Sequence, residues 1–180
     1  DYAFEKGINF IDTAEMYPIG GNEHIFGSTE RHIGTWLKKI GSQRENIVVA
    51  TKIAGPNRGM DYIRKPLDFS KKSIHEAVDL SLKNLQTDYL DVLLLHRPSP
   101  LMIADEVAEA VEKLKSEGKI LSFGVSNFTP SQTELLRQKT EVSFNQIQFS
   151  ATNYQAMLDG SLDYMKLHKI TPMAWNPLGV

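Results

Sequence analysis

The chain reads DYLDVLLLH over residues 88–96, an apolar run of strand length that ends in His96. Two earlier stretches have the same form, since INFID over residues 8–12 ends in Asp12 and IVVATK over residues 47–52 ends in Lys52. Short apolar runs of this kind are typical of strands buried in a parallel sheet. Because parallel strands end at one edge of their sheet, the sequence predicts that these three residues and the nearby Tyr17 share one pocket.

Strand-like and helix-like segments alternate along the chain, which indicates βα units and a parallel sheet. The helix after residue 70 shows the evidence best, because Ile74, Ala77, Val78 and Leu85 recur at helical spacing. The predicted strands lie near residues 8–13, 47–53, 89–96, 121–126, 144–149 and 171–176. The predicted helices lie near residues 29–40, 71–86, 104–117, 130–139 and 160–169.

Open α/β sheets and a closed barrel compete for this alternation. A doubly wound dinucleotide-binding sheet carries Gly-x-Gly-x-x-Gly after its first strand, and the sequence has no such pattern. Chemically capable residues instead recur at strand ends, where a (β/α)8 TIM barrel builds its active site. We therefore predict one partial α/β barrel domain over residues 1–180, with about six of the eight βα units, the first strand and everything after the seventh being absent.

Composition favours small-molecule chemistry. A net charge of -2 and a pI near 6.2 create no field that attracts nucleic acid or an acidic membrane surface, and the apolar runs are shorter than the ~20 residues of a membrane helix. The absence of cysteine excludes disulfides and Cys-ligated zinc. We expect a cytoplasmic protein with no metal, whose oligomeric state stays open.

The predicted pocket suits proton donation by a tyrosine. Free tyrosine has a pKa of about 10, and the ammonium of Lys52 is expected to lower the pKa of Tyr17 while Asp12 holds that ammonium in place. His96 adds a hydrogen-bond donor that can polarise a carbonyl. Because no side chain donates hydride, such a pocket implies a nicotinamide or flavin partner.

Several motifs together carry a resemblance to a known family. They are GINFIDTA over residues 7–14, GVSNF over residues 124–128 and AWNPL over residues 174–178, along with DYLD at 88–91 before His96. By these motifs the chain resembles the aldo-keto reductases. The resemblance implies reduction of an aldehyde or ketone to an alcohol, with Tyr17 as general acid, Lys52 and Asp12 tuning it and His96 orienting the carbonyl.

The same resemblance implies a cofactor site. Ser126, Asn127 and Gln146 match the residues with which the family holds the nicotinamide carboxamide, and Trp175 matches its ring-stacking aromatic. NADPH is the usual cofactor, and NADH stays open because the family's adenosine phosphate-binding segment lies after its seventh strand. The loop over residues 54–69 is expected to overhang the pocket mouth and to shape specificity.

Each of the strand-end residues also has an ordinary structural role open to it. Asp12 can cap a turn, Lys52 can be a solvated charge and His96 can be a satisfied histidine under a loop. A non-catalytic, cofactor-binding regulatory protein on the same fold is the alternative function. A metal-dependent barrel hydrolase lacks ligands, because the other four histidines show no metal-ligand spacing and are expected at the surface or on helix faces: His24, His32, His75 and His168.

Overall fold

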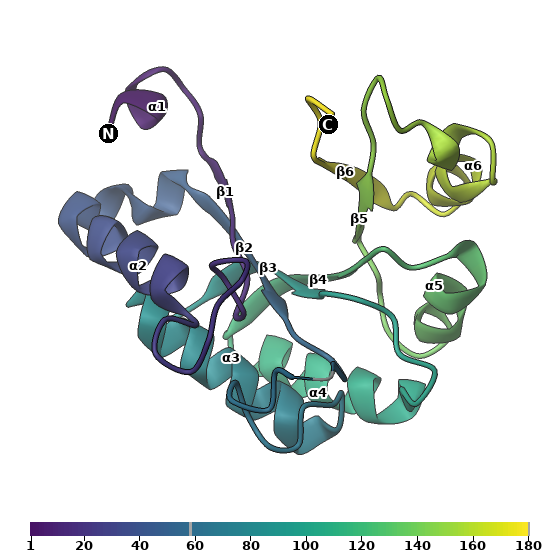
Figure 1. The fold of residues 1–180 in the computed structure, drawn as a ribbon, viewed down its shortest axis with the longest axis horizontal. Helices are drawn as coiled ribbons and strands as arrows, with labels where there is room; N and C mark the ends of the chain where they lie inside the picture. Colours follow the sequence, from purple (N-terminus) through teal and green to yellow (C-terminus); the bar gives the residue numbers. More distant parts are fainter. Residues whose placement is uncertain (58, 180) are drawn as a thin grey trace.

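A single curled sheet of six parallel strands organises the protein. The structure is a computed structural model that describes residues 1–57 and 59–179, so that Arg58 and Val180 lie outside the described residues. The strands pair in sequence order and are β1 (Phe10–Asp12), β2 (Val48–Ile53), β3 (Leu90–Leu95), β4 (Ile120–Ser126), β5 (Phe144–Gln148) and β6 (Thr171–Trp175). The helices cover the convex outer side of the curl, and both chain ends lie at the top of Figure 1.

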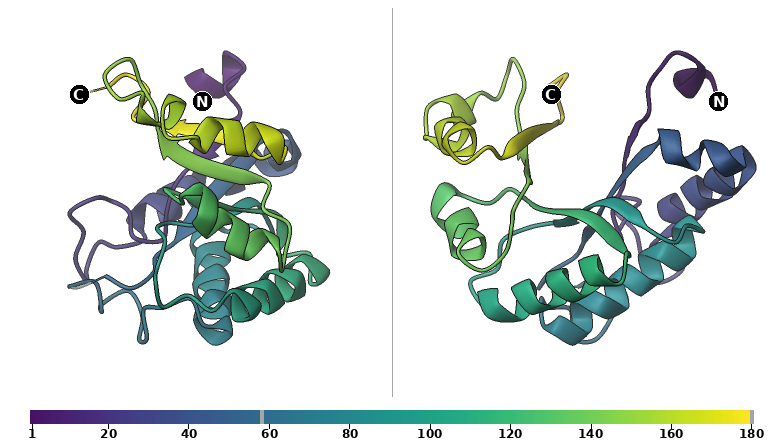
Figure 2. Two further views of the ribbon diagram at one scale, coloured as in Figure 1. Left: turned by 90° about the vertical axis from the view of Figure 1, so that its right-hand side faces the viewer. Right: turned by 180° about the vertical axis from the view of Figure 1, so that it is seen from behind.

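Together with the sheet, the helices form a half-barrel, which the right-hand panel of Figure 2 shows from behind. They are α1 (Tyr2–Glu5), α2 (Ser28–Ile40), α3 (Lys71–Leu85), α4 (Ala104–Ser116), α5 (Pro130–Arg137) and α6 (Ser161–Leu167), with 3-10 turns η1 (Gly41–Asn46) and η2 (Gln155–Met157). All six predicted strands and all five predicted helices are confirmed, each boundary within two residues. The prediction of an incomplete barrel is confirmed, whereas the two 3-10 turns were not among the predicted elements.

Local signals fix where these helices begin. The Ser70 hydroxyl accepts a hydrogen bond from the Ser73 amide at the start of α3, which satisfies one of the free N–H groups of the first turn. Thr129 and Gln132 form a capping box at the start of α5, with Pro130 in its first turn. These contacts fix the first residues of α3 and α5.

The core lies between the sheet and its outer helices. Along β2, Val49 and Ile53 pack into this outer core, whereas Ala50 belongs to a separate cluster inside the curl. Successive strand residues point to opposite faces, so Lys52 shares the inner face with Ala50. The alternation therefore directs a charged side chain into the barrel. Among the described residues, no helix is long and apolar enough to cross a membrane.

Close packing of α2 on α3 depends on a glycine. A Cβ built on Gly34 would lie 2.2 Å from the Asn84 carbonyl oxygen and 2.7 Å from the Leu85 carbonyl carbon. Both neighbours are backbone atoms and cannot turn aside. The two helices can approach this closely only because residue 34 has no side chain.

Candidate active site

The carboxyl ends of the first three strands bring four of the predicted residues together. Asp12 ends β1, Lys52 lies in β2, His96 follows β3, and Tyr17 lies in the loop after β1. The Tyr17 ring stands edge to face with the His96 ring at a centroid distance of 5.8 Å, and the Lys52 Nζ lies 5.4 Å from the Tyr17 ring centroid. Residues that are far apart in sequence thus form one cluster.

Lys52 is almost fully buried, with 1% of its surface exposed. Its Nζ donates to both carboxylate oxygens of Asp12 and to the Thr13 carbonyl oxygen, each at 2.7 Å. Burial lowers the pKa of Lys52, and the attraction of Asp12 opposes that shift. All three ammonium protons are therefore used by Asp12 and Thr13, and none is directed at the tyrosine hydroxyl.

Tyr17 is half-buried, and its pKa is raised above the usual value. Burial is the largest cause and the negative charge of Asp12 adds to it, while the positive charge of Arg97 opposes it. The prediction that the pKa of Tyr17 is lowered is therefore wrong for this structure, because burial penalises the phenolate and the negative charge of Asp12 adds to that penalty. Tyr17 keeps its proton at neutral pH.

His96 is neutral. Burial lowers its pKa to about 3, and the nearby charges of Lys52 and Arg97 act in the same direction. Its Nδ1 is buried and has no hydrogen-bond partner in the described part of the chain. An unpaired N–H is costly to bury, so the ring proton belongs on Nε2, and His96 can act as a neutral hydrogen-bond donor.

The four predicted cofactor-binding residues form a second cluster at the ends of β4, β5 and β6. Trp175 Nε1 donates to the Asn127 side-chain oxygen at 2.9 Å, and the Asn127 amide donates to the Ser126 hydroxyl at 2.9 Å. Ser126 in turn donates to the Gln146 carbonyl oxygen at 3.1 Å. Asn127 has a left-handed backbone with φ of 61°, a conformation that asparagine tolerates better than most residues.

One cavity joins the two clusters. It has a volume of about 200 Å³ and is lined by Met16, Tyr17, Ile19, His96, Arg97, Ser126, Asn127, Gln146 and Trp175. Hydroxyl and amide groups beside an indole ring provide the donors, acceptors and flat apolar surface that a planar ring bearing an amide requires. The arrangement therefore fits both a carbonyl group near Tyr17 and a nicotinamide near Trp175.

Met16, Ile19 and Arg97 line the cavity but were not predicted as site residues. Arg97 had a signal in the sequence, because it directly follows His96 at a strand end. Met16 and Ile19 had none beyond their closeness to Tyr17. Apolar residues in a loop do not differ in pattern from ordinary core residues.

A buried ion pair holds the loop after β2 against the loop that carries Tyr17. The Arg64 Nε donates to the Glu15 carboxylate at 3.0 Å, and the Ala54 amide donates to the same carboxylate at 2.8 Å. Arg64 also bonds the Ala54 carbonyl oxygen and the Ser73 hydroxyl. Sequence reasoning missed this pair, whose members are 49 positions apart.

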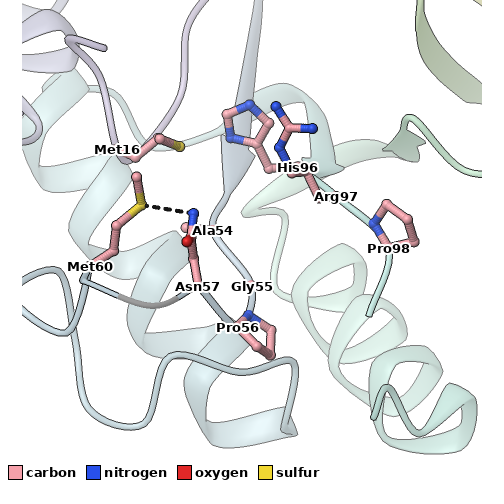
Figure 3. A pocket seen from close by; sticks show the side chains of 9 residues that line it. All are labelled: Met16, Ala54, Gly55, Pro56, Asn57, Met60, His96, Arg97 and Pro98. Atoms are coloured by element: carbon pink, nitrogen blue, oxygen red, sulfur yellow. Dashed lines mark hydrogen bonds between the residues drawn. The ribbon is translucent and has the colours of Figure 1, made fainter. Parts of the chain in front are cut away.

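The same loop borders a second hollow beside His96 (Figure 3). Residues 54–57 and Met60 form one wall, and His96, Arg97 and Pro98 form the other. The loop over residues 54–69, in which Arg58 lies outside the described residues, was expected to overhang the pocket mouth. Residues 54–57 and Met60 lie beside His96 in this hollow, but none of the described residues of the loop lines the larger cavity. The loop's effect on specificity stays a prediction.

The remaining histidines lie elsewhere. His24 and His32 are exposed, and His75 and His168 are partly buried on helices or at their ends. In the part of the chain that the structure describes, no three His, Cys, Asp or Glu side chains are grouped so that they could hold a metal ion.

Comparisons with known proteins agree with this geometry. The Aldo/keto reductase family model matches residues 1–180. The oxidoreductase YcsN of Bacillus subtilis strain 168 is 39% identical over 184 residues, and the oxidoreductase YdhF of Escherichia coli strain K12 is 38% identical over 179 residues. The matches cover 99% and 97% of this chain but only 59% and 57% of those relatives.

Solved structures share the fold. The crystal structure of an aldo/keto reductase from Klebsiella pneumoniae in complex with NADP and acetate superposes with a TM-score of 0.78 at 30% identity. The superposition covers 96% of this chain and 54% of that one. The chain thus spans rather more than half the length of these three proteins.

Proposed function

Because this chain belongs to the aldo/keto reductase family, we propose that it provides the catalytic part of an enzyme that reduces an aldehyde or ketone to an alcohol with NADPH. One observation carries the proposal, namely that four residues meet at the strand ends: Asp12, Tyr17, Lys52 and His96. Two of them, Tyr17 and His96, line the same cavity as the side-chain amides of Asn127 and Gln146. NADH is the alternative cofactor, since no residue of this chain is assigned to the adenosine phosphate.

The cofactor site is proposed to lie at the ends of β4, β5 and β6. Ser126, Asn127 and Gln146 would hold the carboxamide, and Trp175 would stack on the ring. A bound nicotinamide supplies the hydride. Support comes from the complex of the Klebsiella pneumoniae protein with NADP.

The chain's own residues are proposed to handle the carbonyl oxygen and its proton. His96, neutral and protonated on Nε2, donates a hydrogen bond that orients the carbonyl. As hydride reaches the carbonyl carbon, the Tyr17 O–H bond breaks and its proton passes to the carbonyl oxygen, leaving a phenolate. The raised pKa of Tyr17 keeps the acid protonated before the reaction.

The phenolate that remains needs a positive charge nearby. Lys52 lies 5.4 Å from the Tyr17 ring centroid and is held there by Asp12, so its ammonium can stabilise the phenolate without first reorganising. Asp12 is therefore a positioning residue for Lys52. Because the Lys52 ammonium stabilises the negative charge that develops on Tyr17, proton donation by Tyr17 is easier in the transition state than its ground-state pKa suggests.

The test begins with NADPH titrated into the 180-residue chain and into a version extended at both ends, followed by nicotinamide fluorescence. Consumption of NADPH is then measured with an aldehyde. The proposal predicts binding and turnover in at least one of the two forms. Tight binding without turnover would favour a non-catalytic regulatory protein on the same fold.

Tyr17→Phe tests the acid directly. We expect turnover to fall by about 10²- to 10⁴-fold while the affinity for NADPH changes little, because the phenol oxygen is not assigned to the cofactor. Tyr154→Phe is the matched control, since Tyr154 is 55% exposed and does not line the cavity. Wild-type turnover of every carbonyl by Tyr17→Phe would show that another group is the acid.

A further inference from the structure

Two hollows meet at His96, and the proposed function uses only one of them. The second has a volume of about 30 Å³, and it shares Met16, His96 and Arg97 with the larger cavity. A space of this size holds a group of about two or three heavy atoms. A substrate whose carbonyl lies between Tyr17 and His96 can therefore extend a small substituent into it.

Arg97 gives this hollow a positive charge. Arg44, Arg64 and Arg137 each pair with a carboxylate of the fold. Arg31 and Arg97 are exposed and form no ion pair among the residues described here, and of these two only Arg97 lines the hollow. Figure 3 shows its guanidinium beside the His96 ring, at the wall that both hollows share. Its five N–H donors are thus available at the site.

The charge of Arg97 reaches both reacting groups. It lowers the pKa of His96 and opposes the rise in the pKa of Tyr17. An unpaired guanidinium in this position attracts an anion to the place where a substrate must lie. Arginine binds a carboxylate through two parallel hydrogen bonds.

We propose that Arg97 and the hollow lined by Met16, Asn57 and Met60 form a subsite for a carboxylate on the carbonyl substrate. The substrate class is then a short oxo acid, with the carboxylate a few bonds from the carbonyl carbon. The small hollow favours a carboxylate over a phosphate. This inference rests on the proposed reductase function, which it makes more specific.

The kinetic test compares 4-oxobutanoate with butanal, which has the same chain length and no charge. In Arg97→Met, we expect the ratio of kcat/KM for 4-oxobutanoate to that for butanal to fall by about 10- to 100-fold. Arg97→Lys keeps the charge but loses the two parallel hydrogen bonds to a carboxylate, so its ratio should lie between those of the wild type and Arg97→Met. Lys38→Met removes an equal charge from exposed Lys38 in α2 and controls for net charge. An unchanged ratio in Arg97→Met would overturn the proposal.

A binding measurement separates this proposal from the reductase function itself. Succinate is titrated into the wild type and into Arg97→Met, each checked by thermal unfolding, and its dissociation constant is measured by calorimetry. We expect at least tenfold weaker binding in the variant even if no aldehyde is turned over. Equal affinity in the two proteins, or no succinate binding by the wild type, would overturn the carboxylate subsite.

Discussion

Acidification should destabilise the folded chain through His96. The folded state holds this histidine neutral, with a pKa of about 3, whereas an unfolded histidine has a pKa near 6.5. A depressed pKa of this kind leaves stability intact above about pH 6.5 and removes it as the pH falls toward 3. Between those pH values His96 is protonated in the unfolded state but stays neutral in the folded state.

The size of the effect follows from the two pKa values. Each pH unit below 6.5 is worth somewhat more than 1 kcal/mol, so the loss is about 1 kcal/mol at pH 5.5 and about 3 kcal/mol at pH 4.5. Near pH 7.5 the contribution is almost zero. His96 is only 9% exposed, so solvent screens this effect little.

The assay is urea unfolding followed by tryptophan fluorescence at pH 7.5, 5.5 and 4.5. His96→Gln removes the titrating ring, and exposed His24, changed to Gln, controls for the loss of a histidine elsewhere. We expect the unfolding free energy of the wild type to fall relative to His96→Gln by about 3 kcal/mol between pH 7.5 and 4.5. If the two proteins lose stability in parallel, His96 accepts a proton equally well when folded, and the argument from burial fails.

Two further predictions concern a buried ion pair and the contact between two helices. Arg64→Met leaves the buried Glu15 carboxylate without its ion pair and should lower the unfolding free energy by about 3–5 kcal/mol. Adding Glu15→Gln should recover part of that loss. If the double variant is as unstable as the sum of the two single variants, the two side chains act independently. Gly34→Ala places a Cβ against the backbone of Asn84 and Leu85, so it should lower the unfolding free energy by about 1–3 kcal/mol. A rise in the thermal unfolding midpoint of this variant would mean that α2 and α3 are not packed as described.

The fold was predictable because its signals are local. Strand-length apolar runs alternate with helical periodicity, and caps such as Ser70 and Thr129 lie within three residues of the groups that they satisfy. Such patterns need no knowledge of the tertiary structure. The 3-10 turns η1 and η2 carry no periodic apolar pattern, and they were missed for that reason.

That the predicted residues lie close together could be read from the sequence, whereas the electrostatics of the candidate site could not. Strand order alone places Asp12, Lys52 and His96 at one sheet edge, because all parallel strands end there. It does not show that the three ammonium protons of Lys52 go to Asp12 and Thr13. Nor does it show how deeply Tyr17 is buried or how near it lies to Asp12, which is why the direction of its pKa shift was predicted incorrectly.

By itself, the sequence determined the half-barrel, the strand ends that carry the reactive residues and the family resemblance, since each depends on neighbouring residues or on short motifs. Only the tertiary structure decided that His96 is neutral, that Glu15 meets Arg64, and that Arg97 stands unpaired where two hollows join. Desolvation and Coulomb interactions depend on distances between side chains that are remote in sequence. Those distances exist only once the chain has folded.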